Sequence, residues 1–200
     1  MRLLLIRHPR PDVPEGLCYG RTDVPADAQD FESLVARLRA RWAAGTHPRP
    51  DAVYTSPLQR CERVARALAG DVWPEPVVDA RLMEMDFGDW EGRRWPEIPR
   101  AELDAWRANV VENRAPGGES VGLMSARAGA FAGEHLGEDR HGPDSLVVLM
   151  THAGIIQTLP HLLREIPFGQ FRMGKLDYGT ITTLTRRDGR FELESHNVAP

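Results

Sequence analysis

Three short segments of the chain are almost continuously apolar, and each is flanked by polar or turn-forming residues. They are residues 3–6, 51–55 and 145–150. Their side chains do not alternate between apolar and polar types, as they would in antiparallel strands with one face in water. The pattern therefore predicts parallel strands that are buried on both faces, as in an α/β protein.

Helical periodicity is found between these strands. Apolar residues recur at helical spacing over residues 28–44 and again in the run that follows the second strand. In that run Ser56 is the predicted N-cap, Pro57 the first helical residue and Gly70 the terminator. Both helices present an apolar stripe, so we expect them to pack on the sheet.

Two further helices are predicted in the second half of the chain. They cover roughly residues 120–136 and 153–164, and Pro160 is expected to kink or split the second one. The preceding stretch, residues 72–118, is rich in Pro, Trp and charge and has no clear period. It contains one short predicted helix near residues 101–110, and we interpret the whole stretch as an insertion over the sheet.

The end of the chain has a different pattern. β-prone runs flank Asp188-Gly189, which predicts a hairpin with strands near 180–187 and 190–196. No repeat or low-complexity linker divides residues 1–200, so we expect a single domain. The fold class that follows is α/β: a three-layer αβα sandwich with a mostly parallel central sheet and an antiparallel hairpin at its C-terminal edge.

Composition narrows the class of protein. The apolar fraction of 42% and the charged fraction of 27% are ordinary for a globular domain, and no apolar run is long enough to cross a membrane. The net charge of −4 argues against nucleic-acid binding.

Arg7 and His8 interrupt the first apolar run too early for a signal peptide. Cys18 and Cys61 form neither a disulfide framework nor a metal-binding spacing. We expect a cytoplasmic protein with reduced thiols and no membrane or nucleic-acid partner, and its oligomeric state stays open.

Polar side chains follow three of the predicted strands. They are Arg7 and His8, then Ser56 and Arg60, then Thr151 and His152. In parallel α/β sheets, ligands bind beyond the carboxyl ends of the strands, so these residues are expected to meet at one edge. The run LMEMDFGDWEG adds four carboxylates: Glu84, Asp86, Asp89 and Glu91.

Each of these residues alone has an ordinary structural explanation. A lone histidine at a strand end is usually a hydrogen-bonded structural residue. Arg60 alone could be a solvated helix arginine, since all but one of the 25 basic residues are arginine. The acidic run alone could be a solvated loop. What favours a functional site is the predicted meeting of the three strand ends.

Five motifs resemble the motif series of the histidine phosphatase superfamily, in its phosphoglycerate mutase-like branch. They are LLLIRHPRP, YTSPLQRCERVA, LMEMDFGDWEG, PGGES and VVLMTHAG, and they span residues 3 to about 165 in the family's order. Four features make the match specific: the RH pair after a first strand, SPLxR at the start of a helix, the ExxFGxWEG run and a late HAG after a strand.

The resemblance implies a metal-independent phosphatase with no cofactor, acting on a small-molecule phosphate ester. His8 would be the nucleophile and would form a phosphohistidine. Arg7, Arg60 and His152 would hold the phosphoryl oxygens. Glu84 would protonate the leaving alkoxide and then activate water.

The chain departs from the family pattern at three positions. Pro9 replaces the usual glycine after the RH pair, Pro14 replaces an asparagine six residues after the nucleophile, and Val64 replaces a threonine in the second motif. Losing the asparagine removes one expected phosphate ligand. The candidates to replace it in substrate binding are Arg10, Tyr19 and Arg21.

Three alternatives stay open. A phosphoglycerate mutase-type transfer would share the phosphohistidine, but mutases of this family carry a longer insertion and a C-terminal tail over the site. Because this chain ends at Pro200, just after the predicted hairpin, we favour the phosphatase. A non-catalytic phosphate-binding module would need the arginines but not both His8 and Glu84. A metal hydrolase would use the loosely spaced His8, His152, Asp12 and Asp23.

The substrate prediction depends on a narrower resemblance. GLCYGRTDVP, residues 16–25, is similar to a stretch of the bacterial α-ribazole phosphatase subgroup, which favours α-ribazole 5′-phosphate, an intermediate of cobalamin nucleotide-loop assembly. Trp95 and Trp106 lie in the insertion expected over the active site and offer aromatic faces for a nucleoside-like group. Packing of the insertion onto the sheet is the role we favour for them.

Overall fold

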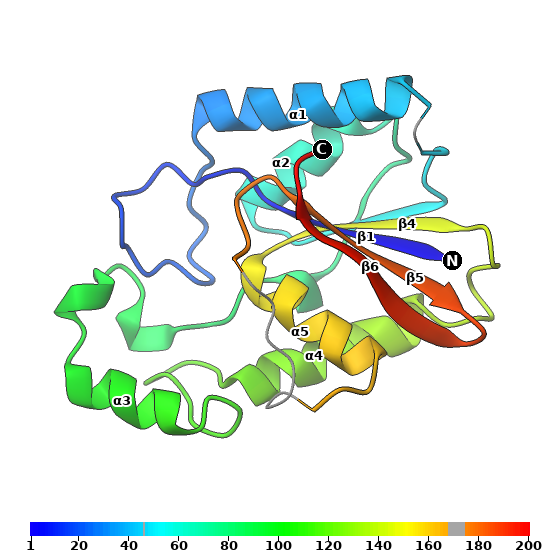
Figure 1. The fold of residues 1–200 in the computed structure, drawn as a ribbon. Helices are drawn as coiled ribbons and strands as arrows, with labels where there is room; N and C mark the ends of the chain where they lie inside the picture. The colour runs from blue at the N-terminus through cyan, green and yellow to red at the C-terminus, as the bar shows by residue number, and fades with distance from the viewer. Residues whose placement is uncertain (46, 168–174) are drawn as a thin grey trace.

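The computed structural model describes residues 1–45, 47–167 and 175–200, and within these ranges six strands form one sheet. They are β1 (Arg2–Arg7), β2 (Ala52–Thr55), β3 (Val77–Val78), β4 (Leu146–Thr151), β5 (Ile181–Arg187) and β6 (Arg190–Val198). Their order across the sheet is β3-β2-β4-β1-β5-β6 (Figure 1). The first four strands pair in parallel, whereas β5 and β6 are antiparallel at one edge. The predicted sheet and its C-terminal hairpin are confirmed.

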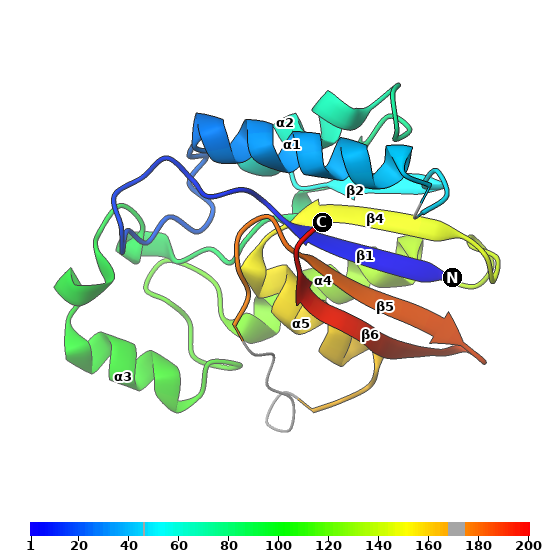
Figure 2. The same ribbon diagram turned by 45° about the horizontal axis from the view of Figure 1, so that its top comes forward.

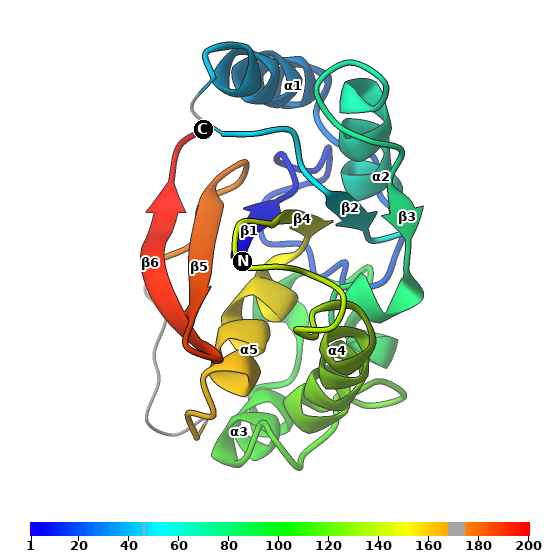
Figure 3. The same ribbon diagram turned by 90° about the vertical axis from the view of Figure 1, so that its right-hand side faces the viewer.

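Helices cover both faces of this sheet. The described helices are α1 (Ala28–Ala43), α2 (Gln59–Leu68), α3 (Arg100–Ala108), α4 (Val121–His135) and α5 (Ala153–Leu163). Figures 2 and 3 show α1 and α2 on one face and α4 and α5 on the other, which confirms the three-layer αβα sandwich. Among the described residues, no helix combines the length and the apolar character needed to cross a membrane.

The central strand β1 shows why its sequence is continuously apolar. Leu3 and Leu5 belong to the hydrophobic core under α4 and α5, whereas Leu4 and Ile6 belong to the core under α1 and α2. All four side chains are fully buried. A strand buried on both faces has no position for a polar side chain, so polar residues first occur where the strand ends.

The predicted start of α2 is wrong. The helix begins at Gln59 with Leu58 in the N-cap position, not at Pro57 after Ser56. The hydroxyl of Ser56 still accepts a hydrogen bond from the Leu58 N–H, at 3.3 Å. The carboxylate of Asp23 accepts the Gln59 N–H at 2.7 Å, so a distant residue supplies the capping acceptor. At the other end, the helix stops before Gly70, whose φ of 75° lies in the left-handed region.

Two other sequence predictions need adjustment. Pro160 does not split α5, because the helix runs through it to Leu163. The stretch 72–118 first contributes the edge strand β3 to the sheet and then forms three 3₁₀ turns and α3. In Figures 1 and 2, α3 lies beyond the carboxyl ends of β1 and β4.

Candidate active site

The ends of β1 and β4 bring the two histidines together. Arg7 pairs in register with Thr151, so His8 and His152 leave the sheet at the same edge. Their ring centroids are 5.0 Å apart. β2 lies on the other side of β4 and delivers the hydroxyl of Ser56 to within 2.8 Å of Nε2 of His152. The structure thus confirms the prediction that the polar residues at the ends of these three strands converge at one edge of the sheet.

His8 is held as a neutral ring with one defined tautomer. Its side chain is 1% exposed, and Nδ1 lies 2.7 Å from the carbonyl oxygen of Pro9. A carbonyl can only accept, so Nδ1 carries the hydrogen and Nε2 keeps its lone pair. Burial, followed by the charge of Arg60, lowers the pKa of His8 well below 6.5, with a smaller contribution from Arg7. The result is an imidazole with an unprotonated Nε2 beside two guanidinium groups.

Arg60 is positioned by the backbone of the loop that carries Tyr19. The arginine is 1% exposed, and its two terminal nitrogens donate to the carbonyls of Thr22 at 2.9 Å and Gly20 at 2.7 Å. The carboxylate of Glu91 anchors this loop by accepting the backbone N–H of Thr22 at 2.7 Å. Gly20 allows the close approach, because a Cβ there would overlap the Glu91 carboxylate.

Arg7 and His152 complete the positive and polar surroundings of His8. Arg7 donates to the carbonyl of Leu176 at 2.5 Å, and its Cζ lies 3.8 Å from the ring centroid of Tyr178. Its Nε, like that of Arg60, is buried without a hydrogen-bond partner. Burial, and then His8 and Arg60, lower the pKa of His152 well below 6.5, so this ring is neutral as well.

The carboxylate of Glu84 is held by backbone groups. Met85 donates its N–H to Oε1 at 2.9 Å, and the Gly154 N–H lies 3.1 Å from both carboxylate oxygens. The guanidinium of Arg127 binds the surrounding backbone, including the carbonyl of Glu84 at 2.9 Å, and pairs with Glu119 at 3.0 Å. Glu119 belongs to the PGGES motif, which therefore supports the segment that carries Glu84.

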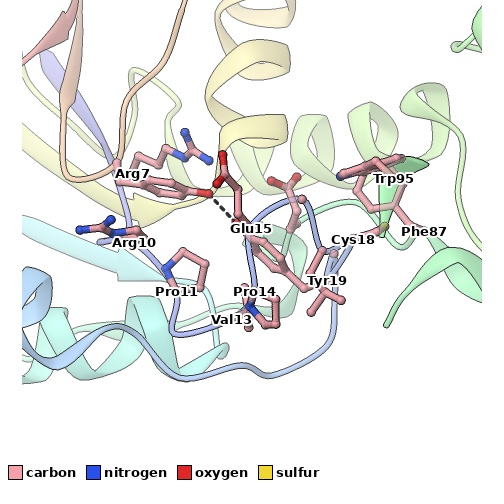
Figure 4. Close-up of a pocket in the computed structure, with 15 residues that line it drawn as sticks. Arg7, Arg10, Pro11, Val13, Pro14, Glu15, Cys18, Tyr19, Phe87 and Trp95 are labelled. Atoms are coloured by element: carbon pink, nitrogen blue, oxygen red, sulfur yellow. Dashed lines mark hydrogen bonds between the residues drawn. The ribbon is translucent and has the colours of Figure 1, made fainter. Parts of the chain in front are cut away.

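A cavity of about 660 Å³ opens at this edge of the sheet (Figure 4). Its polar and aromatic lining includes Arg7, Arg10, Glu15, Tyr19, Glu84, Phe87, Trp95 and Tyr178. Pro14, at the position of the family's asparagine, is also part of the wall. His8, Arg60 and His152 are buried and do not form part of the wall. The geometry therefore combines a cavity with a buried group that contains two neutral imidazoles and a guanidinium.

The three candidates for the missing phosphate ligand are placed differently. Tyr19 lines the cavity. Arg10 also lines it, but its guanidinium pairs with Asp30 at 3.1 Å. Arg21 is not part of the cavity wall, and its guanidinium lies 3.1 Å from the carboxylate of Glu119. Of the three, only Tyr19 combines a place in the wall with a side chain that no carboxylate holds.

Several positioning groups could not be recognised from the sequence. Tyr178 lies in the wall but precedes the hairpin without any motif around it. Glu91 lies in the LMEMDFGDWEG motif, but the motif does not reveal that its carboxylate anchors the loop of Arg60. The role of the Pro9 carbonyl depends on backbone direction, which the residue type does not reveal.

The side chains named for the metal-hydrolase alternative do not form a ligand set. In the described part of the chain, no group of three or more His, Cys, Asp or Glu side chains is close enough to hold a metal ion. Asp23 is instead used at the start of α2, where it accepts the Gln59 N–H.

Comparison with known families agrees with this geometry. The model of the histidine phosphatase superfamily (branch 1) matches residues 3–199. The chain belongs to the histidine phosphatase superfamily. The predicted family is confirmed, and with it the expectation that the chain is an enzyme of the phosphatase type.

Relatives of this histidine phosphatase carry different substrate names. A putative phosphoserine phosphatase 2 of Hydrogenobacter thermophilus is 30% identical over 82% of this chain and 79% of its own length. The adenosylcobalamin/α-ribazole phosphatase of Escherichia coli K12 is 28% identical over 90% of this chain and 87% of its own. The structure of a mycobacterial glucosyl-3-phosphoglycerate phosphatase complexed with VO₃ matches with a TM-score of 0.84 at 27% identity, covering 99% of both chains.

Proposed function

We propose that this chain is a metal-independent phosphomonoester hydrolase that works through a phosphohistidine on Nε2 of His8. The observation that carries the proposal is the Nδ1 contact with the Pro9 carbonyl in a buried ring of lowered pKa. A nucleophile of this kind must be unprotonated at the attacking nitrogen. The Pro9 carbonyl fixes the hydrogen on Nδ1, and burial and the charge of Arg60 lower the pKa of the ring although this hydrogen bond by itself raises it.

The two half-reactions use His8 and Glu84 in turn. Nε2 of His8 forms a bond to phosphorus while the ester oxygen leaves, and the carboxyl group of Glu84 gives its proton to that oxygen. Water then attacks the phosphohistidine, Glu84 takes a proton from it, and the P–N bond breaks to release inorganic phosphate. Glu84 lies in the cavity wall, where a leaving group would be located.

Charge on the phosphoryl group is balanced by Arg7 and Arg60. The Nε atoms of both side chains are buried without a hydrogen-bond partner, so each has a hydrogen left to donate to a phosphoryl oxygen. Their positions are set in advance by backbone carbonyls, so little reorganisation is needed when negative charge develops in the transition state. His152, neutral and bonded to Ser56, would contribute a further polar contact.

The experiment that tests this reaction compares wild type with His8→Ala on p-nitrophenyl phosphate. Loss of the nucleophile should lower kcat by at least about 1,000-fold while circular dichroism stays unchanged. His47→Ala is the matched control and should keep full activity, because this ring packs against Trp42 near the end of α1. A His8→Ala variant with more than about a tenth of the wild-type rate would contradict the proposal.

For the substrate, α-ribazole 5′-phosphate is the proposal that the residues support best. Phe87, Trp95 and Tyr19 give the cavity aromatic faces for a nucleoside-like base. Trp95 also contacts Trp90 and Phe87, so it packs the insertion as well as lining the cavity. The E. coli relative named for this activity matches over 90% of the chain.

A substrate panel decides between the activities named for the relatives. Purified protein should turn over α-ribazole 5′-phosphate with a kcat/KM at least about 10-fold above phosphoserine, glucosyl-3-phosphoglycerate and 3-phosphoglycerate. Equal or lower turnover of α-ribazole 5′-phosphate would exclude it as the preferred substrate but would not contradict the proposed chemistry at His8. Activity that depends on a bisphosphorylated primer would favour the mutase instead.

We also propose that the protein works in the cytoplasm. Both cysteines, Cys18 and Cys61, are free and buried, as is usual where thiols are kept reduced.

A further inference from the structure

Two tyrosines from opposite ends of the chain meet in the cavity. The hydroxyls of Tyr19 and Tyr178 are 3.1 Å apart, and we call these two residues the tyrosine pair. The dashed line in Figure 4, beside the label of Glu15, marks this hydrogen bond. Tyr19 belongs to the loop that holds Arg60, whereas Tyr178 precedes β5, so the bond joins two separate loops across the site.

The tyrosine pair lines the cavity and is also close to His8. Both tyrosines line the cavity, whereas His8 is 1% exposed. The ring centroid of His8 is 6.5 Å from that of Tyr19 and 5.6 Å from that of Tyr178. Both phenol groups are therefore close to the imidazole that is proposed to attack phosphorus.

Each tyrosine also contacts one of the arginines beside His8. Cζ of Arg7 lies 3.8 Å from the ring centroid of Tyr178, and Cζ of Arg60 lies 5.0 Å from that of Tyr19. These stacked arginines place both phenol groups next to the charges that would attract a phosphoryl group. Each phenol ring thus lies beside one of the two cations that are proposed to balance the charge of the phosphoryl group.

The hydroxyls are suited to donate to an anion. Burial raises the pKa of Tyr19, and the hydrogen bond with Tyr178 raises it further, so this phenol keeps its proton at neutral pH. Two phenols have two hydrogens, but their mutual bond uses only one of them. Opening the bond frees both hydrogens for the oxygens of a phosphate.

We propose that Tyr19 and Tyr178 bind the phosphoryl group, and that their mutual hydrogen bond is exchanged for two bonds to phosphoryl oxygens when an ester enters. This inference depends on the proposed function of His8. It assigns a substrate-binding role to Tyr178, and it supplies the donors that this chain lacks because Pro14 stands where the family has an asparagine.

The test measures binding of orthovanadate and inorganic phosphate to Tyr19→Phe and Tyr178→Phe, by competition against p-nitrophenyl phosphate. Each change removes only the hydroxyl and keeps the ring over its arginine. A hydrogen bond to a charged group is expected to be worth about 10- to 100-fold in affinity, so each variant should bind both anions that much more weakly, with a similar fall in kcat/KM.

Tyr54→Phe is the matched control, because Tyr54 is the third tyrosine of the chain and packs against Phe131 in the core. Its anion affinity should equal that of wild type. Unchanged or tighter vanadate binding in both Tyr19→Phe and Tyr178→Phe would overturn the inference and would mean that the hydroxyls only close the site. The proposed function is tested separately, since wild type must still form a phosphohistidine that His8→Ala lacks.

Discussion

The backbone nitrogen of Gly154 lies 3.1 Å from both carboxylate oxygens of Glu84. This contact joins the acid of one motif to the HAG glycine of another, 70 residues later. A Cβ on residue 154 would overlap Oε1 of Glu84 and come within 2.9 Å of Sδ of Met124. The absence of a side chain at this position therefore allows the carboxylate of Glu84 to approach the start of α5.

Gly154→Ala should displace Glu84 and impair proton transfer to the leaving group. We expect kcat to fall by about 100-fold on alkyl phosphates, which need the proton, and much less on p-nitrophenyl phosphate, which does not. Glu84→Gln should show the same dependence on leaving-group pKa. Gly133→Ala is the control, because a Cβ there meets open space in α4. Equal slowing of good and poor leaving groups by Gly154→Ala would contradict this role.

The buried histidines should make the free energy of unfolding depend on pH. Burial lowers the pKa of both His8 and His152 well below 6.5 in the folded protein, so the unfolded chain binds more protons as the pH falls through that value. The free energy of unfolding is therefore highest above pH 6.5. Below that pH it decreases by up to about 1.4 kcal/mol per pH unit for each histidine. Urea unfolding between pH 7.5 and about 5 measures the slope. His8→Asn and His152→Asn should each reduce the slope, and an unchanged slope in both would contradict the neutral assignment.

Glu91 should act on catalysis through the loop that positions Arg60. Its carboxylate accepts the backbone N–H groups of Arg21 at 2.8 Å and Phe87 at 3.0 Å as well as that of Thr22. Glu91→Ala should raise KM for p-nitrophenyl phosphate about 10-fold and cost about 1–3 kcal/mol of stability, because these donors lose their acceptor. Asp89→Ala changes an exposed carboxylate of the same acidic run and should leave KM unchanged. A KM in Glu91→Ala equal to that of wild type would exclude this positioning role.

Much of the sheet could be predicted because burial on both faces leaves a strong pattern. The segment 145–150 is predicted from its apolar run, and all residues of β4 are buried. β3 was not predicted, because it has only two residues and both are exposed, so it leaves no apolar run in the sequence. The start of α2 was misplaced because Asp23, 36 residues before Gln59, supplies a capping acceptor that no local rule can reveal.

The part of the site that lies at strand ends or within motifs could be predicted from the sequence. His8 and His152 meet because each follows a strand, and neighbouring parallel strands end together. Tyr178 could not be found in this way, since its contact with Tyr19 spans 159 residues and depends on how two loops fold over the sheet. Arg21 was a candidate phosphate ligand because it is an arginine in the right segment. The sequence could not reveal that Asp86 and Glu119, from other segments, hold its guanidinium.

The bond between His8 and phosphorus can be observed directly. Wild-type protein is mixed with p-nitrophenyl phosphate, quenched at alkaline pH during the first turnovers, since phosphohistidine survives in alkali, and its peptides are analysed by mass spectrometry. The predicted result is a phosphoryl group on the imidazole of His8 that forms at the rate of the p-nitrophenol burst and is missing from His8→Ala. Phosphorylation of another residue in its place, or turnover in which no protein-bound phosphate forms, would contradict nucleophilic attack by His8.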